Sequence, residues 1–168
     1  CADYTGFGRS DKPTDRGWYS YDGHVELVSN VLGGLDLSDA VVVVQDWGGL
    51  LGLTLPMEMP ERFSRLLIMN TMLGTGDVPL TEGFLAWRAY VAKNPDLACG
   101  KLLARTCPHL QPEAAAAYDA PFPDTRYKAG VRRFPQLVPE HENDPGAAIS
   151  RKARHWLRTS WTGESRMA

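Results

Sequence analysis

The spacing of hydrophobic and polar positions changes several times within the first seventy residues of the chain. Between Tyr21 and Gly34, apolar residues recur every three or four positions, which predicts an amphipathic helix ended by a glycine pair. Residues 41–44 are consecutive valines, apolar on both faces of a pleat, and they predict a strand buried within a parallel sheet. A helix that ends around residues 56–60 follows, and then a strand over residues 65–70. This alternation predicts an α/β fold with a parallel sheet.

After Asn70 the pattern becomes helical only. Thr81 precedes an apolar stripe that Asn94 and Pro95 end, and prolines at the borders of later segments argue against strands. Short helices inserted after a strand predict a helical cap, or lid. We expect a partial core over residues 1–74, the cap over residues 75–160 and the start of the next core strand over residues 161–168. Further helices are expected over residues 96–106, 112–119, 125–133 and 144–156, a strand exit over residues 1–5, a structured loop over residues 6–13 and the next strand from residue 163.

The junction between the valine strand and the next helix carries the candidate chemistry. Asp46 stands at this turn and is followed by Trp47, Gly48 and Gly49. One interpretation is that Asp46 only caps the helix, because aspartate is a common N-cap residue. The other is a nucleophile elbow, in which a reactive side chain projects from the carboxyl edge of the sheet beside backbone N–H groups. The two glycines favour the elbow, because a cap alone does not require them.

An aspartate at this position would act differently from the more usual serine. Its reference pKa is about 3.9, so the carboxylate is ionised at neutral pH and needs no base to activate it. It can displace a leaving group from an sp3 carbon and form an alkyl ester on the protein. Water must then hydrolyse that ester with help from a general base, normally a histidine oriented by a second carboxylate.

Displacement of this kind expels an anion, which the site must stabilise as its charge forms. An indole N–H donates a hydrogen bond and cannot accept one, and it belongs to an apolar ring that keeps water out. Trp47 lies directly after Asp46, and Trp87 is the best candidate for a second indole donor, from the first cap helix. The alternative for Trp87 is core packing, because it shares an apolar stripe with Phe84 and Val91.

Composition limits the partners and the compartment. A net charge of −2 offers no basic face for nucleic acid, and no apolar run approaches the roughly twenty residues that span a membrane. The three cysteines are irregularly spaced, which argues against a disulfide framework and suits a reducing, cytoplasmic compartment. No CxxC motif or Cys/His cluster indicates a metal. Because the chain opens on Cys1 and stops at Ala168, we expect it to be an internal piece whose signal peptide, if any, would lie outside it.

Four segments together resemble the haloalkane dehalogenases. They are Gly6 to Pro13, Val43 to Gly49, Gly83 to Trp87, and Ala120 to Pro135, and the likeness covers nearly all of the chain. The resemblance implies a partial α/β-hydrolase parallel sheet with an inserted helical cap. It also implies an enzyme that converts a haloalkane and water to an alcohol, a halide and a proton without a cofactor. Trp87 in the first cap helix is similar to the arrangement of one subfamily.

The resemblance also implies roles for individual residues. Asp46 would be the nucleophile, Trp47 and Trp87 would bind the halide, and the Trp47 backbone N–H would be an oxyanion donor. No cofactor or metal is implied. The complete protein is expected to be a monomer whose partners are a small haloalkane, water and the halide ion, with no nucleic acid and no membrane. The side chains expected to line the substrate pocket are Leu50, Phe84, Phe134, Pro135 and Val138.

The rest of the catalytic triad is not assigned within the chain. By the resemblance, the acid and the catalytic histidine follow Ala168, and Asn70 stands where another subfamily carries its acid. None of the four histidines follows a later sheet strand, so we interpret all of them as structural or surface residues. They are His24, His109, His141 and His155.

Two other hypotheses remain open at this stage. An epoxide hydrolase also uses an Asp-Trp elbow but needs cap tyrosines to protonate the opening ring, and Tyr90, Tyr118 and Tyr127 are present in the cap. The third hypothesis is a non-catalytic domain of the same fold, or a segment that does not fold alone. Exposed sheet edges would then make the chain prone to aggregation.

Overall fold

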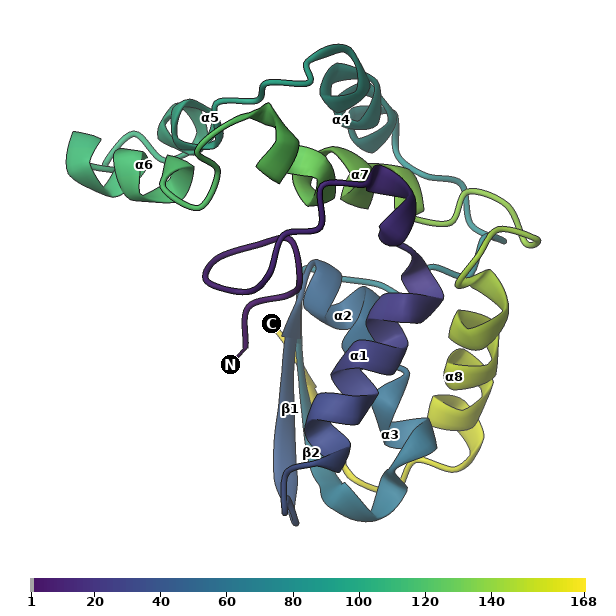
Figure 1. Ribbon diagram of the computed structural model, residues 1–168. Helices are drawn as coiled ribbons and strands as arrows, with labels where there is room; N and C mark the ends of the chain where they lie inside the picture. The colour runs from purple at the N-terminus through teal and green to yellow at the C-terminus, as the bar shows by residue number, and fades with distance from the viewer. Residues whose placement is uncertain (1) are drawn as a thin grey trace. The chain divides into compact units, whose positions relative to one another are not determined.

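The computed structural model describes residues 2–168, which form two compact units (Figure 1). The sheet unit comprises Ser20–Pro79 and Val138–Ala168, and the helical unit comprises Cys1–Tyr19 and Leu80–Leu137. The division into units reflects which residues pack together. The N-terminal segment packs with the helices between residues 80 and 137, and the last long helix packs with the sheet. The domain boundaries expected at residues 74 and 160 stay a prediction.

The sheet unit is built on three parallel strands. These are β1 (Ala40–Gln45), β2 (Phe63–Met69) and β3 (Glu164–Met167), in the order β1-β2-β3. Leu66 in β2 lies opposite Val42 on one side and Ser165 on the other. The parallel α/β arrangement is therefore confirmed, as is the expectation that a further strand begins near residue 163.

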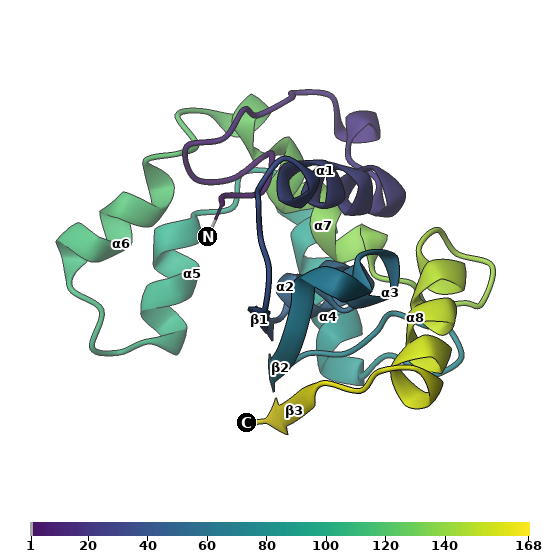
Figure 2. The ribbon, with the colours of Figure 1, turned by 90° about the horizontal axis from the view of Figure 1, so that it is seen from below.

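The helices of the sheet unit lie on one side of the sheet, as the two perpendicular views show (Figures 1 and 2). Ser20 caps the first of them, which begins and ends as expected. The single helix expected after the elbow is instead two short ones, separated at Leu53 and Thr54. The elements are α1 (Tyr21–Gly33), α2 (Trp47–Gly52), α3 (Leu55–Glu58), the 3-10 turn η2 (Pro60–Arg62) and α8 (Ala147–Thr159).

The valine strand is less buried than its sequence predicts. β1 stands at an edge of the described sheet, and Val41 and Val43 are 50% and 56% exposed. Val44 on the opposite face is buried. The expectation of burial on both faces is wrong for this chain, because the helices of the unit cover only one face of the sheet.

The helical unit contains four α-helices, and the bounds of its elements follow the expected pattern with two exceptions. Thr81 caps α4 as predicted by accepting a hydrogen bond from the Phe84 N–H at 3.2 Å. α5 begins three residues later than expected, at Cys99. The elements are the 3-10 turn η1 (Arg16–Trp18), α4 (Glu82–Lys93), α5 (Cys99–Thr106), α6 (Pro112–Asp119), the 3-10 turn η3 (Thr125–Lys128) and α7 (Ala129–Leu137).

The second exception is α7, which continues past its expected end at Arg133 and includes Pro135. A proline inside a helix removes one backbone hydrogen bond and costs about 3 kcal/mol. Contacts with α4 compensate for that loss. Arg88 donates to the Pro135 carbonyl at 2.9 Å, Gln136 donates to the Arg88 carbonyl at 3.2 Å, and Phe134 is buried.

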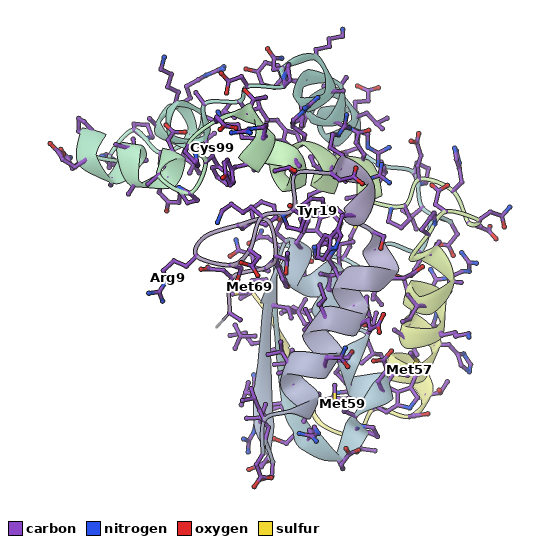
Figure 3. All side chains as sticks on the ribbon, in the orientation of Figure 1. Arg9, Tyr19, Met57, Met59, Met69 and Cys99 are labelled. Carbon is purple, nitrogen blue, oxygen red and sulfur yellow. The ribbon has the colours of Figure 1, made fainter. Side chains whose placement is uncertain are left out.

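The N-terminal segment is a hydrogen-bonded loop. Residues 2–5 form no strand, so the predicted strand exit is not found there, and Cys1 lies outside the described residues. The expected structured loop is confirmed: the Gly6 N–H donates to the Asp11 carbonyl at 2.7 Å, and Lys12 donates to the Gly8 and Ser10 carbonyls at 2.7 and 2.8 Å. The Arg9 side chain extends away from this loop (Figure 3).

Candidate active site

The turn after β1 has the backbone geometry of an elbow. Asp46 adopts φ +49° and ψ −124°, and helix α2 begins at the next residue. A positive φ is uncommon for a residue with a side chain and costs of order 1–3 kcal/mol, so it persists only where the surrounding structure imposes it. The Asp46 side chain makes no capping hydrogen bond and is exposed. The interpretation of Asp46 as an N-cap is therefore wrong, and its carboxylate is available for another role.

Backbone and side-chain contacts hold this strained turn in place. The Asp46 carbonyl accepts hydrogen bonds from the N–H groups of Gly49 and Leu50, at 3.0 and 3.3 Å, and from the Thr71 hydroxyl at 2.6 Å. The Asp46 N–H donates to the carbonyl of Asn70, which also has a positive φ, +40°. Thr71 has a visible sequence signal that was not used to assign it a role: a hydroxyl residue directly after the strand predicted over residues 65–70.

The two elbow glycines differ in the space available for a side chain. A Cβ at Gly49 would lie 2.0 Å from the Thr71 hydroxyl oxygen, so only glycine lets the helix approach this side chain. A Cβ at Gly48 would have no neighbour within 4 Å. Gly49 is therefore the small residue that this elbow requires.

Trp47 is half-buried beside the elbow. Its ring packs against the ring of Tyr21, with centroids 6.1 Å apart and planes tilted by 51°. Tyr21 is fully buried at the start of α1, and burial raises the pKa of its hydroxyl to about 12. Tyr21 has no local sequence signal for this role, since its contact with Trp47 joins residues twenty-six positions apart.

Trp87 stands on α4 of the helical unit. It is 39% exposed, whereas Val91, one turn later on the same helix, is completely buried. The Trp87 ring stacks on Tyr90, with centroids 6.0 Å apart. Core packing, the alternative interpretation of Trp87, does not fit this exposure, and the indole remains available to a ligand.

The residues expected to line a pocket divide between the two units. Asp46, Trp47, Leu50 and Val138 belong to the sheet unit, where Leu50 and Val138 are buried. The helical unit contains Phe84, Trp87, Phe134 and Pro135. That all eight line one cavity stays a prediction.

Phe134 forms an aromatic cluster with the N-terminal segment. Its ring meets that of Phe7 edge-on at 4.6 Å and lies 6.4 Å from the rings of Tyr4 and Tyr19. Gly6 and Gly130 both approach the Tyr19 ring closely enough that a Cβ at either would meet it within about 3 Å. The loop after residue 6, which carries part of the family resemblance, therefore supports a predicted pocket residue.

Comparison with known proteins places this geometry in a family. A family model described as the alpha/beta hydrolase fold matches residues 1–160. The chain belongs to the α/β-hydrolase fold family. The elbow between β1 and α2 and the helices that follow β2 are therefore parts of an α/β-hydrolase fold.

Two curated relatives of this α/β hydrolase are named haloalkane dehalogenases. The chain is 45% identical over 162 residues to a haloalkane dehalogenase of Psychrobacter cryohalolentis, covering 95% of this chain and 53% of the relative. It is 44% identical over 152 residues to a haloalkane dehalogenase of Mycolicibacterium paratuberculosis, covering 90% and 50%. The chain thus spans about half the length of the curated relatives it matches.

A solved structure agrees with the curated relatives. The tetrameric haloalkane dehalogenase DpaA from Paraglaciecola agarilytica NO2 superposes with a TM-score of 0.91 at 40% identity, covering 98% of this chain and 55% of that one. The resemblance to the haloalkane dehalogenases drawn from four sequence segments is therefore confirmed.

The histidines of this α/β hydrolase lie where the sequence analysis expected. His24 is buried in α1 with its Nδ1 2.8 Å from the Ser20 carbonyl, a structural position. His109, His141 and His155 are exposed. Within residues 2–168, no cluster of three or more His, Cys, Asp or Glu side chains is arranged to hold a metal ion. Each helix in that range is too short or too polar to cross a lipid bilayer.

Proposed function

We propose that the protein containing this chain hydrolyses haloalkanes to an alcohol and a halide through an ester on Asp46. The observation that carries the proposal is the elbow: an exposed carboxylate at φ +49°, bound to no helix N–H and followed directly by an indole. The identity to haloalkane dehalogenases over most of the chain supports it.

The reaction divides into two balanced steps. An Asp46 carboxylate oxygen attacks the carbon that bears the halogen, the carbon–halogen bond breaks, and the halide leaves with the bonding electron pair. Water then attacks the ester carbonyl, which releases the alcohol and a proton and restores the carboxylate. By the resemblance, the base for the second step and the acid that orients it follow Ala168.

The two indoles would supply the electrostatic part of catalysis. A carbon-bound halogen carries little charge and the departing halide carries nearly all of it, so neutral N–H donors bind the transition state more strongly than the substrate. Trp47 supports this role by its place beside the nucleophile, and Trp87 by its exposure on α4. Leu50, Phe84, Phe134, Pro135 and Val138 are proposed to line the substrate pocket.

The decisive experiment replaces the nucleophile in the full-length protein. Asp46→Asn preserves the size of the side chain and removes its charge, so bromide release from a bromoalkane should be abolished. In ¹⁸O-labelled water, a single wild-type turnover should give alcohol with unlabelled oxygen, because that oxygen comes from the carboxylate. Bromide release by Asp46→Asn, or label in the first alcohol formed, would contradict the ester mechanism.

Epoxide hydrolysis remains the second candidate because Tyr90 is 42% exposed and stacks on Trp87 in the cap. An epoxide hydrolase would need such a tyrosine as an acid, whereas halide displacement would not. The rates of the full-length protein with an epoxide and with a bromoalkane of equal chain length separate the two functions. A Tyr90→Phe variant that retains bromide release would favour dehalogenation.

Assembly and compartment are proposed from the sequence alone. The complete protein is expected to be a monomer in the cytoplasm that binds haloalkane, water and halide, whereas the DpaA structure is described as tetrameric. Light scattering on the full-length protein, over a range of concentrations, distinguishes a monomer from a tetramer.

A further inference from the structure

Tyr21 connects three segments of the sheet unit through one hydroxyl group. This residue is completely buried at the first position of α1. Its hydroxyl donates to the backbone carbonyl of Leu50 in α2, and it lies 3.1 Å from the hydroxyl of Ser150, a fully buried residue of α8. Since the Leu50 carbonyl can only accept, the Tyr21 proton goes to it, and Ser150 therefore donates to the Tyr21 oxygen.

The Leu50 carbonyl has a specific need for this donor. Helix α2 is six residues long, and in a longer helix the Leu50 carbonyl would accept from the Thr54 N–H. Here the Thr54 N–H donates to Leu51 instead, at 3.2 Å. In α2, which begins directly after Asp46, the buried Leu50 carbonyl two residues before the helix end is therefore satisfied by the Tyr21 hydroxyl. Such a group costs about 1–3 kcal/mol when it is left unpaired.

The ring of Tyr21 is held as closely as its hydroxyl. It packs on the Trp47 ring at 6.1 Å. A Cβ at Gly146, which has φ +86°, would lie 2.3 Å from the Tyr21 ring, so this glycine lets the backbone before α8 approach it. Tyr21 therefore contacts α2 at two points, its first residue through the ring and its fourth through the hydroxyl.

We propose that Tyr21 is a positioning residue that fixes the Trp47 indole for halide binding by anchoring α2 at both points, with Ser150 orienting its hydroxyl. This inference rests on the proposed function, because it gives Trp47 a halide to bind. Tyr21 touches neither substrate nor nucleophile in this role. It acts through the orientation of α2.

The test compares Tyr21→Phe with the wild type in the full-length protein. The variant keeps the ring and leaves the Leu50 carbonyl without its donor. The bromide dissociation constant, measured by tryptophan fluorescence at constant ionic strength, should rise about fivefold. The kcat/KM for a bromoalkane should fall with it. All measurements are made at a temperature where the variant is fully folded, so that lost stability by itself does not change the result.

Tyr19→Phe is the matched control. Tyr19 is equally buried, and its hydroxyl also donates to a backbone carbonyl, that of Pro13 at 2.8 Å, in the helical unit (Figure 3). The control should lose comparable stability without a change in bromide affinity. If Tyr21→Phe does not fold, Ser150→Ala takes its place, with an expected rise in the dissociation constant of about twofold.

The outcomes separate the two proposals. A folded Tyr21→Phe that binds bromide like the wild type overturns the positioning role, while wild-type turnover of the bromoalkane still supports the proposed function. Equal loss of bromide affinity in Tyr19→Phe also overturns it, because a general loss of stability would then explain both. A wild-type protein that neither binds bromide nor releases it refutes the proposed function, and the role of Tyr21 with it.

Discussion

The Thr71 hydroxyl oxygen lies 2.6 Å from the backbone carbonyl oxygen of Asp46 and donates a hydrogen bond to it. This bond joins the ends of the neighbouring strands β1 and β2, where Asp46 itself and Asn70, the residue before Thr71, both have positive φ. Because the bond uses backbone on the Asp46 side, the carboxylate is left free. The strain at the proposed nucleophile is therefore held by its neighbours.

Gly49→Ala should disrupt this arrangement. The added methyl group would lie 2.0 Å from the Thr71 hydroxyl oxygen and 2.2 Å from its methyl carbon, so the helix or Thr71 must move. We expect a loss of about 1–3 kcal/mol in the free energy of unfolding, measured by urea denaturation.

Gly48→Ala is the control for that substitution. A Cβ there has no neighbour within 4 Å, and alanine is the better helix former by about 1 kcal/mol. Gly48→Ala should therefore leave the protein equally or more stable. Equal destabilisation by both variants would show that the close approach of Thr71 is not what requires glycine.

Thr71→Val should weaken the elbow without changing its volume. The Asp46 carbonyl keeps its bonds to the Gly49 and Leu50 N–H groups and loses the hydroxyl, so stability should fall by about 1 kcal/mol. Thr159→Val is the comparison, since the Thr159 hydroxyl also donates to a carbonyl, that of His155, but within one turn of α8 rather than between two strand ends. The prediction fails if urea denaturation gives the two variants the same stability.

The ion pair between Asp77 and Arg154 should make the stability of the protein depend on pH in the acidic range. Hydrogen bonds from Arg154, at 3.1 and 2.5 Å, and from Thr75 lower the Asp77 pKa from 3.8 to about 2. Since the folded value is below the unfolded one, the contribution of this pair is present above about pH 4 and is lost as the pH falls toward 2. Asp77→Asn should therefore be less stable than the wild type at pH 6, and the difference should shrink by pH 2.

Arg154→Met tests whether the pair is the cause. The single variants and the double variant should show similar losses in thermal unfolding at pH 6, because each removes the same interaction. Additive losses would mean that the two residues act independently.

Tyr21 should give the opposite pH dependence, a loss of stability at high pH. Burial raises its pKa from 10.0 to about 12, so the folded state holds the proton more tightly than the unfolded state. The stabilisation of the folded state by the protonated Tyr21 hydroxyl is complete below pH 10. It is lost as the pH rises through about 12, and the total loss is about 3 kcal/mol. Urea unfolding between pH 9 and pH 12 should show a steeper decline for the wild type than for Tyr21→Phe, and parallel declines would contradict this.

Local patterns predicted most elements of the fold. The amphipathic stripe and glycine pair of α1, the Thr81 cap of α4 and the bounds of α6 depend on residues within one or two turns of each other. Patterns failed where a distant partner decides the outcome. α7 passes through Pro135 because contacts with α4 hold it, and the exposure of β1 depends on which elements cover the sheet.

The same division applies to the candidate site. Asp46, Trp47 and Gly49 form one contiguous motif, so their place at an elbow could be predicted from spacing. Thr71 and Tyr21 contact that motif from twenty-five and twenty-six positions away along the chain, and their residue types are common in cores and turns. Only the three-dimensional arrangement shows that they support the elbow.

The half-exposed valines of β1 have a practical consequence for handling this chain. Val41 and Val43 project from the uncovered side of the sheet and expose about half of their surface to water. Such hydrocarbon should retain the 168-residue polypeptide on a hydrophobic-interaction column and make it fluoresce with the dye ANS. The double substitution Val41→Lys and Val43→Lys should shorten the retention time on the column and reduce the ANS fluorescence.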